Sequence, residues 1–339
     1  CNPSLFRIFK IMNQKYSYEI MSLYKSSKSM QFLWLITAVL FIFLMLTNAV
    51  NSAALVNAGL TTWYKHMIPA LFPFMVLSGF LLRSGLSMQL SALLNPILGR
   101  LFRLSPNCIY VIIMGFLCGF PMGANVVAES LSLNRISCRE ADLLLAFCNN
   151  IGPIYFVSFA YAACPFLTLE ITISIMYGIP LLYGLILRYT RYKDIPYTKA
   201  SSTPKHPYGN LNSYNNTLNY PEAFQESFQK SITSIVTLGA YMVIFNVLQL
   251  PLYNTFYQVP ENILCILKGL IEINSGISAI AYFPELNIIV YSIFLPFCGL
   301  CCFFQTYAMI KDTPLSLRKY FKHKIIQTIL TLLIYSCLI

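Results

Sequence analysis

The sequence predicts an all-α, polytopic membrane protein, and three observations support this fold class. Of the 339 residues, 57% are hydrophobic and only 10% are charged, whereas soluble domains carry about 25% charged residues. The hydrophobic residues form long uncharged runs, such as residues 32–50, that can cross a bilayer core. Two further runs are interrupted by small and polar residues in corresponding places. We expect about seven to nine hydrophobic segments, including broken or re-entrant helices, in two loosely repeated halves.

Charge and hydrophobicity divide the chain into five regions. Residues 1–31 form a basic segment that we expect in the cytoplasm, because positively charged flanks stay on that side. Residues 32–50 are predicted as a transmembrane anchor, with a cleaved signal peptide as the alternative. Residues 60–190 and 221–339 form the two halves, and the polar, basic segment 191–220 links them because its composition cannot build a core.

Shorter signals predict individual elements. Ser105 followed by proline is typical of a helix start, and Ser137 with Glu140 matches a capping box. Residues 86–98 are too short to span a membrane and predict an interfacial or re-entrant helix. The last two membrane spans are predicted at 286–309 and 325–339. A basic loop is predicted between them, with Lys311, Arg318, Lys319, Lys322 and Lys324.

The first interruption, residues 119–124, has the sequence Gly-Phe-Pro-Met-Gly-Ala. Glycine permits backbone conformations closed to other residues, and proline prevents a continuous helix. A helix that restarts after such a break presents its N-terminal amides to an anion. Residues 149–153, Asn-Asn-Ile-Gly-Pro, form another interruption. The alternative is a kink that only lets helices pack. The predicted substrate-binding residues are Gly119, Phe120, Pro121, Gly123, Asn125, Asn149, Asn150 and Pro153.

The corresponding interruption in the second half, residues 272–276, contains Glu272 between apolar neighbours. An ionisable group at membrane depth costs about 2.5–3.5 kcal/mol on insertion scales unless it is paired or hydrated. We predict that Glu272, with Asn274 and Ser275, binds a coupling ion, carries a proton or contacts substrate. The alternatives are a helix N-cap or a structural ion pair. Arg83 and Glu129 lie near the ends of apolar runs and are expected to reach water.

Several functional classes lack support in the sequence. The 23 Lys and Arg residues outnumber the 12 Asp and Glu residues, but no nucleic-acid-reading module accompanies this charge. No His-Glu-x-x-His, Gly-x-Ser-x-Gly or Walker A motif is present. The cysteines are scattered through apolar segments and suit packing better than metal binding. We therefore predict no enzyme activity, no cofactor, no metal site and no nucleic acid partner.

Four segments together closely resemble the YlbJ family of sporulation integral membrane proteins: 71–74, 119–124, 147–153 and 269–273. That family is similar to the wider nucleoside-recognition, or Gate, domain group. The resemblance implies a multi-pass protein of the bacterial plasma membrane, or of a membrane around the forespore, associated with passage of the small dianion dipicolinate. In that family, the segment that matches residues 119–124 is often followed by lysine, whereas this chain has Asn125 there. If the family's lysine contacts an anion, this chain must use another cation, and Arg83 or Arg135 is the candidate.

The predicted function is therefore a membrane transporter, or permease, for a small organic anion, with dipicolinate implied by the resemblance. The lipid bilayer is its expected surrounding. The alternative is a non-transporting membrane protein that organises a sporulation complex with other sporulation membrane proteins. Homo-oligomerisation is left open. In the transporter hypothesis, the first break binds the substrate and the second break, at Glu272, supplies the coupling charge.

Overall fold

The computed structural model describes residues 28–197, 220–254 and 259–338, and all the regular elements within these ranges are helical. This confirms the all-α class. The chain divides into two compact units, Cys1–Ala53 and Ala54–Ile339. Most of the predicted basic N-terminal segment and of the predicted linker lies outside the described residues.

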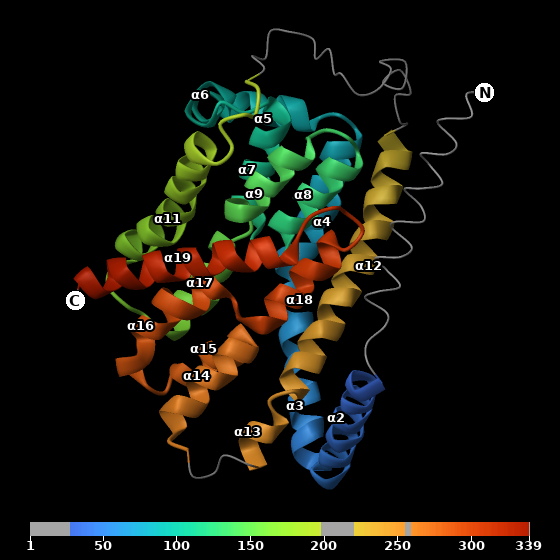
Figure 1. Cartoon of the computed structure of the whole chain (residues 1–339), viewed down its shortest axis with the longest axis vertical. Coiled ribbons are helices and arrows are strands. Elements are labelled where there is room, and N and C mark those ends of the chain that lie inside the picture. Colours follow the sequence, from blue (N-terminus) through green and yellow to red (C-terminus); the bar gives the residue numbers. More distant parts are fainter. Residues whose placement is uncertain (1–27, 198–219, 255–258, 339) are drawn as a thin grey trace. The chain divides into compact units, whose positions relative to one another are not determined.

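The α-helices are labelled in chain order (Figure 1). They are α2 Lys28–Thr47, α3 Ala49–Thr62, α4 Ile68–Arg83, α5 Ser87–Leu94, α6 Arg100–Phe102, α7 Pro106–Cys118, α8 Met122–Ser132, α9 Cys138–Cys148, α10 Pro153–Tyr155, α11 Leu169–Thr190, α12 Tyr220–Val247, α13 Leu250–Asn254, α14 Glu261–Ile271, α15 Ile273–Ile280, α16 Asn287–Ile289, α17 Leu295–Phe297, α18 Gly299–Ile310 and α19 Leu317–Leu338. Short π-helical segments lie at Trp63–Met67, Asn95–Gly99, Phe156–Tyr161 and Val290–Phe294, and a 3₁₀ turn lies at Pro284–Leu286.

Within the described residues, five helical segments are long and apolar enough to cross a membrane. A sixth candidate is the pair Ser87–Phe102 and Pro106–Cys118, which is bent by 102° at its break. The polytopic fold is therefore confirmed, together with a bent segment where the sequence predicts a re-entrant helix. These five candidates are Ala49–Arg83, Cys138–Tyr161, Leu169–Thr190, Tyr220–Tyr253 and Pro284–Ile310.

The helix boundaries near the N-terminus differ from the predicted anchor at 32–50. Helix α2 ends at Thr47, and its apolar part, Gln31–Thr47, is shorter than the candidate spans. The next helix begins at Ala49 and continues to Arg83 despite two internal prolines. A π-helical turn directly before α4 accommodates the first proline, which has no N–H to donate.

Helices α4 and α12 pack side by side along the second unit (Figure 1). Small residues allow this close approach, as is usual between membrane helices. A Cβ atom on Gly239 of α12 would lie 2.5 Å from the Trp63 ring. The indole Nε1 of Trp63 also donates a hydrogen bond to the Ile235 carbonyl oxygen at 2.9 Å. Trp63 therefore joins the segment before α4 to the middle of α12.

Helix α19 differs from the predicted final span at 325–339. It begins at Leu317, runs across the direction of α4 and α12 (Figure 1), and is not among the candidate spans. Its buried face is largely polar, which a span surrounded by lipid could not tolerate. The buried side chains are Tyr320, His323, Lys324, Gln327, Thr331 and Tyr335. Much of the predicted basic loop before the span is therefore helical, and α19 packs against the other helices through its polar face.

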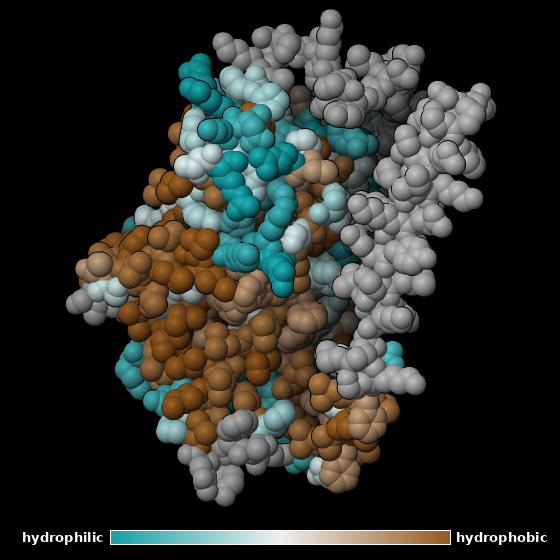
Figure 2. Space-filling model, viewed as in Figure 1, coloured by the Kyte–Doolittle hydropathy of each residue, from teal (hydrophilic) through white to brown (hydrophobic). Residues whose placement is uncertain are grey.

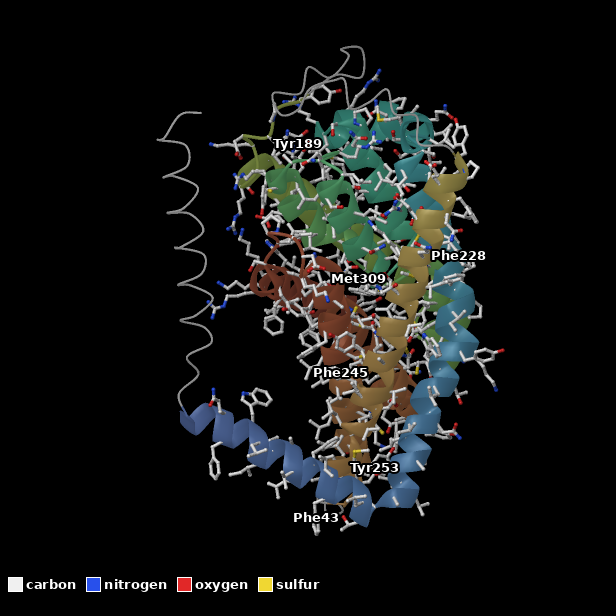
Figure 3. All side chains as sticks on the ribbon, turned by 90° about the vertical axis from the view of Figure 1, so that its right-hand side faces the viewer. Phe43, Tyr189, Phe228, Phe245, Tyr253 and Met309 are labelled. Carbon is white, nitrogen blue, oxygen red and sulfur yellow. The ribbon has the colours of Figure 1, made fainter. Side chains whose placement is uncertain are left out.

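The surface of the second unit suits a bilayer. Figure 2 shows hydrophobic side chains covering the lower part of one face and hydrophilic side chains gathered above them. Exposed apolar residues such as Leu182, Ile186 and Val236 lie on helices that are candidate spans. Tyr189 and Tyr253, both about half exposed, lie toward opposite ends of this unit (Figure 3), as tyrosines at two membrane–water interfaces would.

Candidate functional site

The first interruption forms a tight turn between two packed helices. Helix α7 ends at Cys118, the Phe120–Pro121 peptide is cis, and α8 begins at Met122. Gly119 has φ +80°, a conformation that strongly favours glycine. A Cβ atom at this position would also lie 2.3 Å from the Gly152 backbone nitrogen. The first break and the 149–153 interruption are therefore in direct backbone contact.

The second-half interruption also forms a helical hairpin, between α14 and α15. A Cβ atom on Gly276 would lie 2.1 Å from the Cα atom of Gly269, so glycine is needed where the two helices meet. In the first hairpin, Cβ atoms on Gly115 and Gly123 would each lie 2.4 Å from the Cys148 carbonyl oxygen. The second hairpin thus closes around a glycine pair, whereas the two glycines of the first make room for the Cys148 carbonyl group of α9. The predicted internal repeat stays a hypothesis.

The Glu272 carboxylate occupies the N-terminus of α15 and is only 2% exposed. It accepts hydrogen bonds from the backbone nitrogens of Asn274 at 3.1 Å and Ser275 at 2.8 Å. The side chains of the same two residues donate to it as well. This is the helix N-cap that the sequence allowed as an alternative. It brings all three predicted coupling residues into contact.

The 149–153 interruption is held by side chains from the end of the chain. Asn149 accepts a hydrogen bond from the Ala124 backbone nitrogen at 3.1 Å and donates to Thr306 and Tyr320. Asn150 accepts from Lys324 Nζ at 2.9 Å. Both asparagines are almost fully buried. They act as polar links between the first half and helices α18 and α19.

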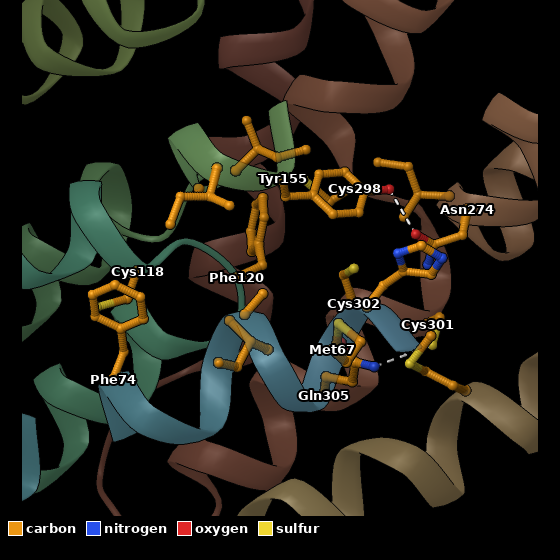
Figure 4. A pocket seen from close by; sticks show the side chains of 18 of the residues that line it. Met67, Phe74, Cys118, Phe120, Tyr155, Asn274, Cys298, Cys301, Cys302 and Gln305 are labelled. Atoms are coloured by element: carbon orange, nitrogen blue, oxygen red, sulfur yellow. Dashed lines mark hydrogen bonds between the residues drawn. The ribbon is translucent and has the colours of Figure 1, made fainter. Parts of the chain in front are cut away.

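A buried pocket, which we call the inner pocket, lies where the interruptions meet (Figure 4). It is lined by residues that include Met67, Phe120, Gly152, Tyr155, Glu272, Asn274 and Cys298. Tyr155 donates a hydrogen bond of 2.6 Å to Asn274 Oδ1, which joins the first half to the second across the pocket. The pocket volume of about 60 Å³ suffices for a few water molecules. The pocket is therefore too small for an organic dianion in this conformation.

A second, larger space of about 530 Å³, which we call the polar cavity, lies between α4, α8, α12 and α18. Its lining includes Arg83, Asn125, Glu129, Ser227, Lys230 and Lys311. Residues 67–74 of the α4 region border the inner pocket, and residues 75–83 of the same helix border the polar cavity. The two spaces therefore follow one another along a shared set of helices.

Arg83 and Glu129 do not extend into bulk water as expected. They form a salt bridge in which the side chains are 1% and 10% exposed, respectively. Arg83 also donates to Ser227 Oγ at 3.2 Å and to Glu226 Oε2 at 3.3 Å. The charges are buried because α8 and α12 both pack against α4. The polar cavity consequently contains a fixed ion pair beside Asn125.

The predicted substrate-binding residues fall into separate environments. Phe120 lines the inner pocket, and Asn125 lines the polar cavity. Gly119, Pro121 and Gly123 shape the first turn, whereas the others form the adjoining interruption. The residues of the adjoining interruption are Asn149, Asn150 and Pro153, and Pro153 begins α10.

The expected presentation of free helix amides to an anion is not observed. The Ala124 amide of α8 is bound by Asn149, and the first amides of α15 are bound by Glu272. The reason is that asparagine and glutamate side chains are effective helix-capping groups. An anion would therefore need another donor or a change of conformation.

Three features of the site were missed in the sequence. Cys298 adopts φ +72° and interrupts the predicted 286–309 span beside the inner pocket; the following Gly299 was the available signal. Tyr155 and Lys324 gave no local signal, because their partners lie more than 100 residues away. Among the described residues, no group of three or more His, Cys, Asp and Glu side chains is placed to hold a metal ion.

The fold and the site define a polytopic helical membrane protein in which broken helices surround a small, largely apolar pocket. The chain is similar to the sporulation integral membrane protein YlbJ of Bacillus subtilis (strain 168), with 25% identity over 86% of this chain and 79% of YlbJ. This similarity supports the YlbJ-type family indicated by the motifs. No protein-family model matches the chain, and no solved structure matches it.

Proposed function

We propose that this chain is a sporulation membrane transporter for a small organic anion, with dipicolinate as the first substrate to test. The observation that carries the proposal is the convergence of the helix interruptions on the inner pocket, which Phe120, Gly152 and Glu272 all line. Non-helical backbone at membrane depth occurs where protein or a water-filled cavity surrounds it. Paired broken helices from two halves of a chain are typical of transport sites.

The polar cavity provides the second part of the proposed path. It continues from the inner pocket along α4, α12 and α18, and Lys230 and Lys311 contribute to its lining. Basic residues gather on the cytoplasmic side of membrane proteins, so in this proposal the cavity opens toward the cytoplasm. The inner pocket, too small in this conformation to hold an organic anion, then separates the cavity from the opposite side of the membrane.

The contact between Tyr155 and Asn274 is the proposed closing element. It spans the pocket between the two halves, and it is linked through Asn274 Nδ2 to Glu272. Opening a path for substrate requires these groups to separate, as expected when one bundle moves against the other. In the proposed cycle, a coupling ion binds Glu272, Asn274 and Ser275 as the side-chain donors turn away and expose their oxygen atoms.

The proposal is tested with purified protein in proteoliposomes. Wild type is expected to take up radiolabelled dipicolinate when an ion or pH gradient is imposed. Glu272→Gln is expected to lower the initial uptake rate at least about tenfold, which corresponds to roughly 1.4 kcal/mol or more. The reason is that the NH₂ group of glutamine is a donor and would face the donors that bind the carboxylate in wild type.

Glu140→Gln is the matched control for Glu272→Gln. Glu140 also caps a helix, accepting from the Ser137 nitrogen at 2.8 Å, but it does not line the inner pocket. We expect this variant to keep the wild-type uptake rate. Absence of dipicolinate uptake by wild type under every imposed gradient would reject the proposal and favour the alternative, a non-transporting organiser of a sporulation complex.

A further inference from the structure

Lys324 is a fully buried lysine on the polar face of α19. Its side chain is among the largest in the molecule with almost no exposed surface, and the residue is 1% exposed. The ammonium donates to Asn150 Oδ1 at 2.9 Å and to Gln327 Oε1 at 3.3 Å. Both acceptors are neutral amides. The positive charge is thus solvated by dipoles of the protein instead of by water.

No carboxylate balances this charge in the part of the chain that the structure describes. The four ion pairs found there involve Arg83 twice, Arg139 and Lys319, and none involves Lys324. Burying an ammonium without a counter-ion is costly, and a methionine would fill a similar volume without that cost. A charged residue kept at such a position is by default a candidate for function.

The position of Lys324 connects it to the inner pocket. Its Nζ atom lies 4.7 Å from the centre of the Phe120 ring, within the range of a cation–π interaction. Phe120 itself lines the pocket. One aromatic side chain therefore contacts both the buried charge and the space proposed for the substrate.

We propose that Lys324 is the carboxylate-binding residue of the inner pocket, reached when the Phe120 ring turns aside. In the closed state, Phe120 and the two amide oxygens stabilise the ammonium. In the open state, a carboxylate of the substrate takes the place of the ring and supplies the missing counter-charge. This inference rests on the proposed transport function. It makes Lys324 the cation that binds the substrate, in place of Arg135 or of Arg83, which is paired with Glu129.

The test compares binding of dipicolinate with binding of its neutral diamide, pyridine-2,6-dicarboxamide, to full-length protein in lipid nanodiscs. Isothermal titration calorimetry of wild type is expected to show tighter binding of the dianion. Lys324→Met and Lys324→Gln are expected to bind dipicolinate about ten- to a hundredfold more weakly, the worth of one charged hydrogen bond. Their affinity for the diamide should be unchanged.

Lys322→Met is the matched control, because Lys322 lies on the same helix but is exposed; it should behave as wild type. Equal dipicolinate binding by wild type and the Lys324 variants would overturn the inference and leave the transport function standing. Equal losses for the dianion and the diamide would also overturn it, since they indicate a structural role. Failure of wild type to bind or transport dipicolinate would overturn both proposals.

Discussion

Replacing Arg83 with methionine is expected to lower the free energy of unfolding by about 3–5 kcal/mol, the usual cost of removing one partner from a buried ion pair. The Arg83 side chain is 1% exposed, and its partner Glu129 is 10% exposed. The substitution leaves the Glu129 carboxylate between α4 and α8 without a positive partner. Denaturation of detergent-solubilised protein, followed by tryptophan fluorescence, measures the loss.

Two further variants show whether the Arg83 effect comes from an unbalanced charge. Glu226 also contacts Arg83, but its side chain is 57% exposed, so Glu226→Gln should cost less than about 1 kcal/mol. The double variant Arg83→Met with Glu129→Met removes both buried charges and should recover most of the stability. A single Arg83→Met variant as stable as wild type would show that water, and not the protein interior, surrounds the Arg83–Glu129 pair.

Replacing Gly119 with alanine is expected to prevent the first hairpin from closing. The residue has φ +80°, and the added Cβ atom would lie 2.3 Å from the Gly152 nitrogen and 2.5 Å from its Cα atom. The backbone conformation costs about 1–3 kcal/mol and the overpacking about as much again. Because the neighbouring atoms belong to backbone, no side-chain rotation relieves the clash. We expect little monodisperse protein and no dipicolinate uptake.

Gly85 provides a control for the backbone term alone. It shares φ +80°, but a Cβ atom there would meet nothing within 4 Å. Gly85→Ala should therefore lose only the conformational contribution, about 1–3 kcal/mol, and should elute as a monodisperse species in size-exclusion chromatography. Equal yields and equal thermal stabilities for the two alanine variants would contradict the tight contact between the two interruptions.

The helix interruptions could be predicted because their signals are local. Glycine and proline in residues 119–124, and Asn-Asn-Ile-Gly-Pro in 149–153, favour a break in a helix whatever their tertiary contacts are. The capping box at Ser137 is confirmed for the same reason, since both of its hydrogen bonds lie within one helical turn. The fold class followed from composition, which does not depend on tertiary contacts.

The environments of the charged residues could not be predicted in the same way. Lys324 lies next to several basic residues in sequence, so its neighbours indicated a solvated loop, whereas its acceptor Asn150 is 174 positions away. Arg83 and Glu226 are separated by 143 positions. Sequence patterns report how a helix is divided into faces, but they do not report which face meets another polar helix.

The hydrogen bonds around Asn149 and Asn150 have a consequence for biosynthesis. These buried amides belong to the first half of the chain, but Thr306, Tyr320 and Lys324, which bind them, are synthesised more than 150 residues later. During insertion, the first half must hold both asparagines without these final partners, and lipid offers no replacement donors or acceptors. The full set of these hydrogen bonds can therefore form only after α19 has emerged from the ribosome.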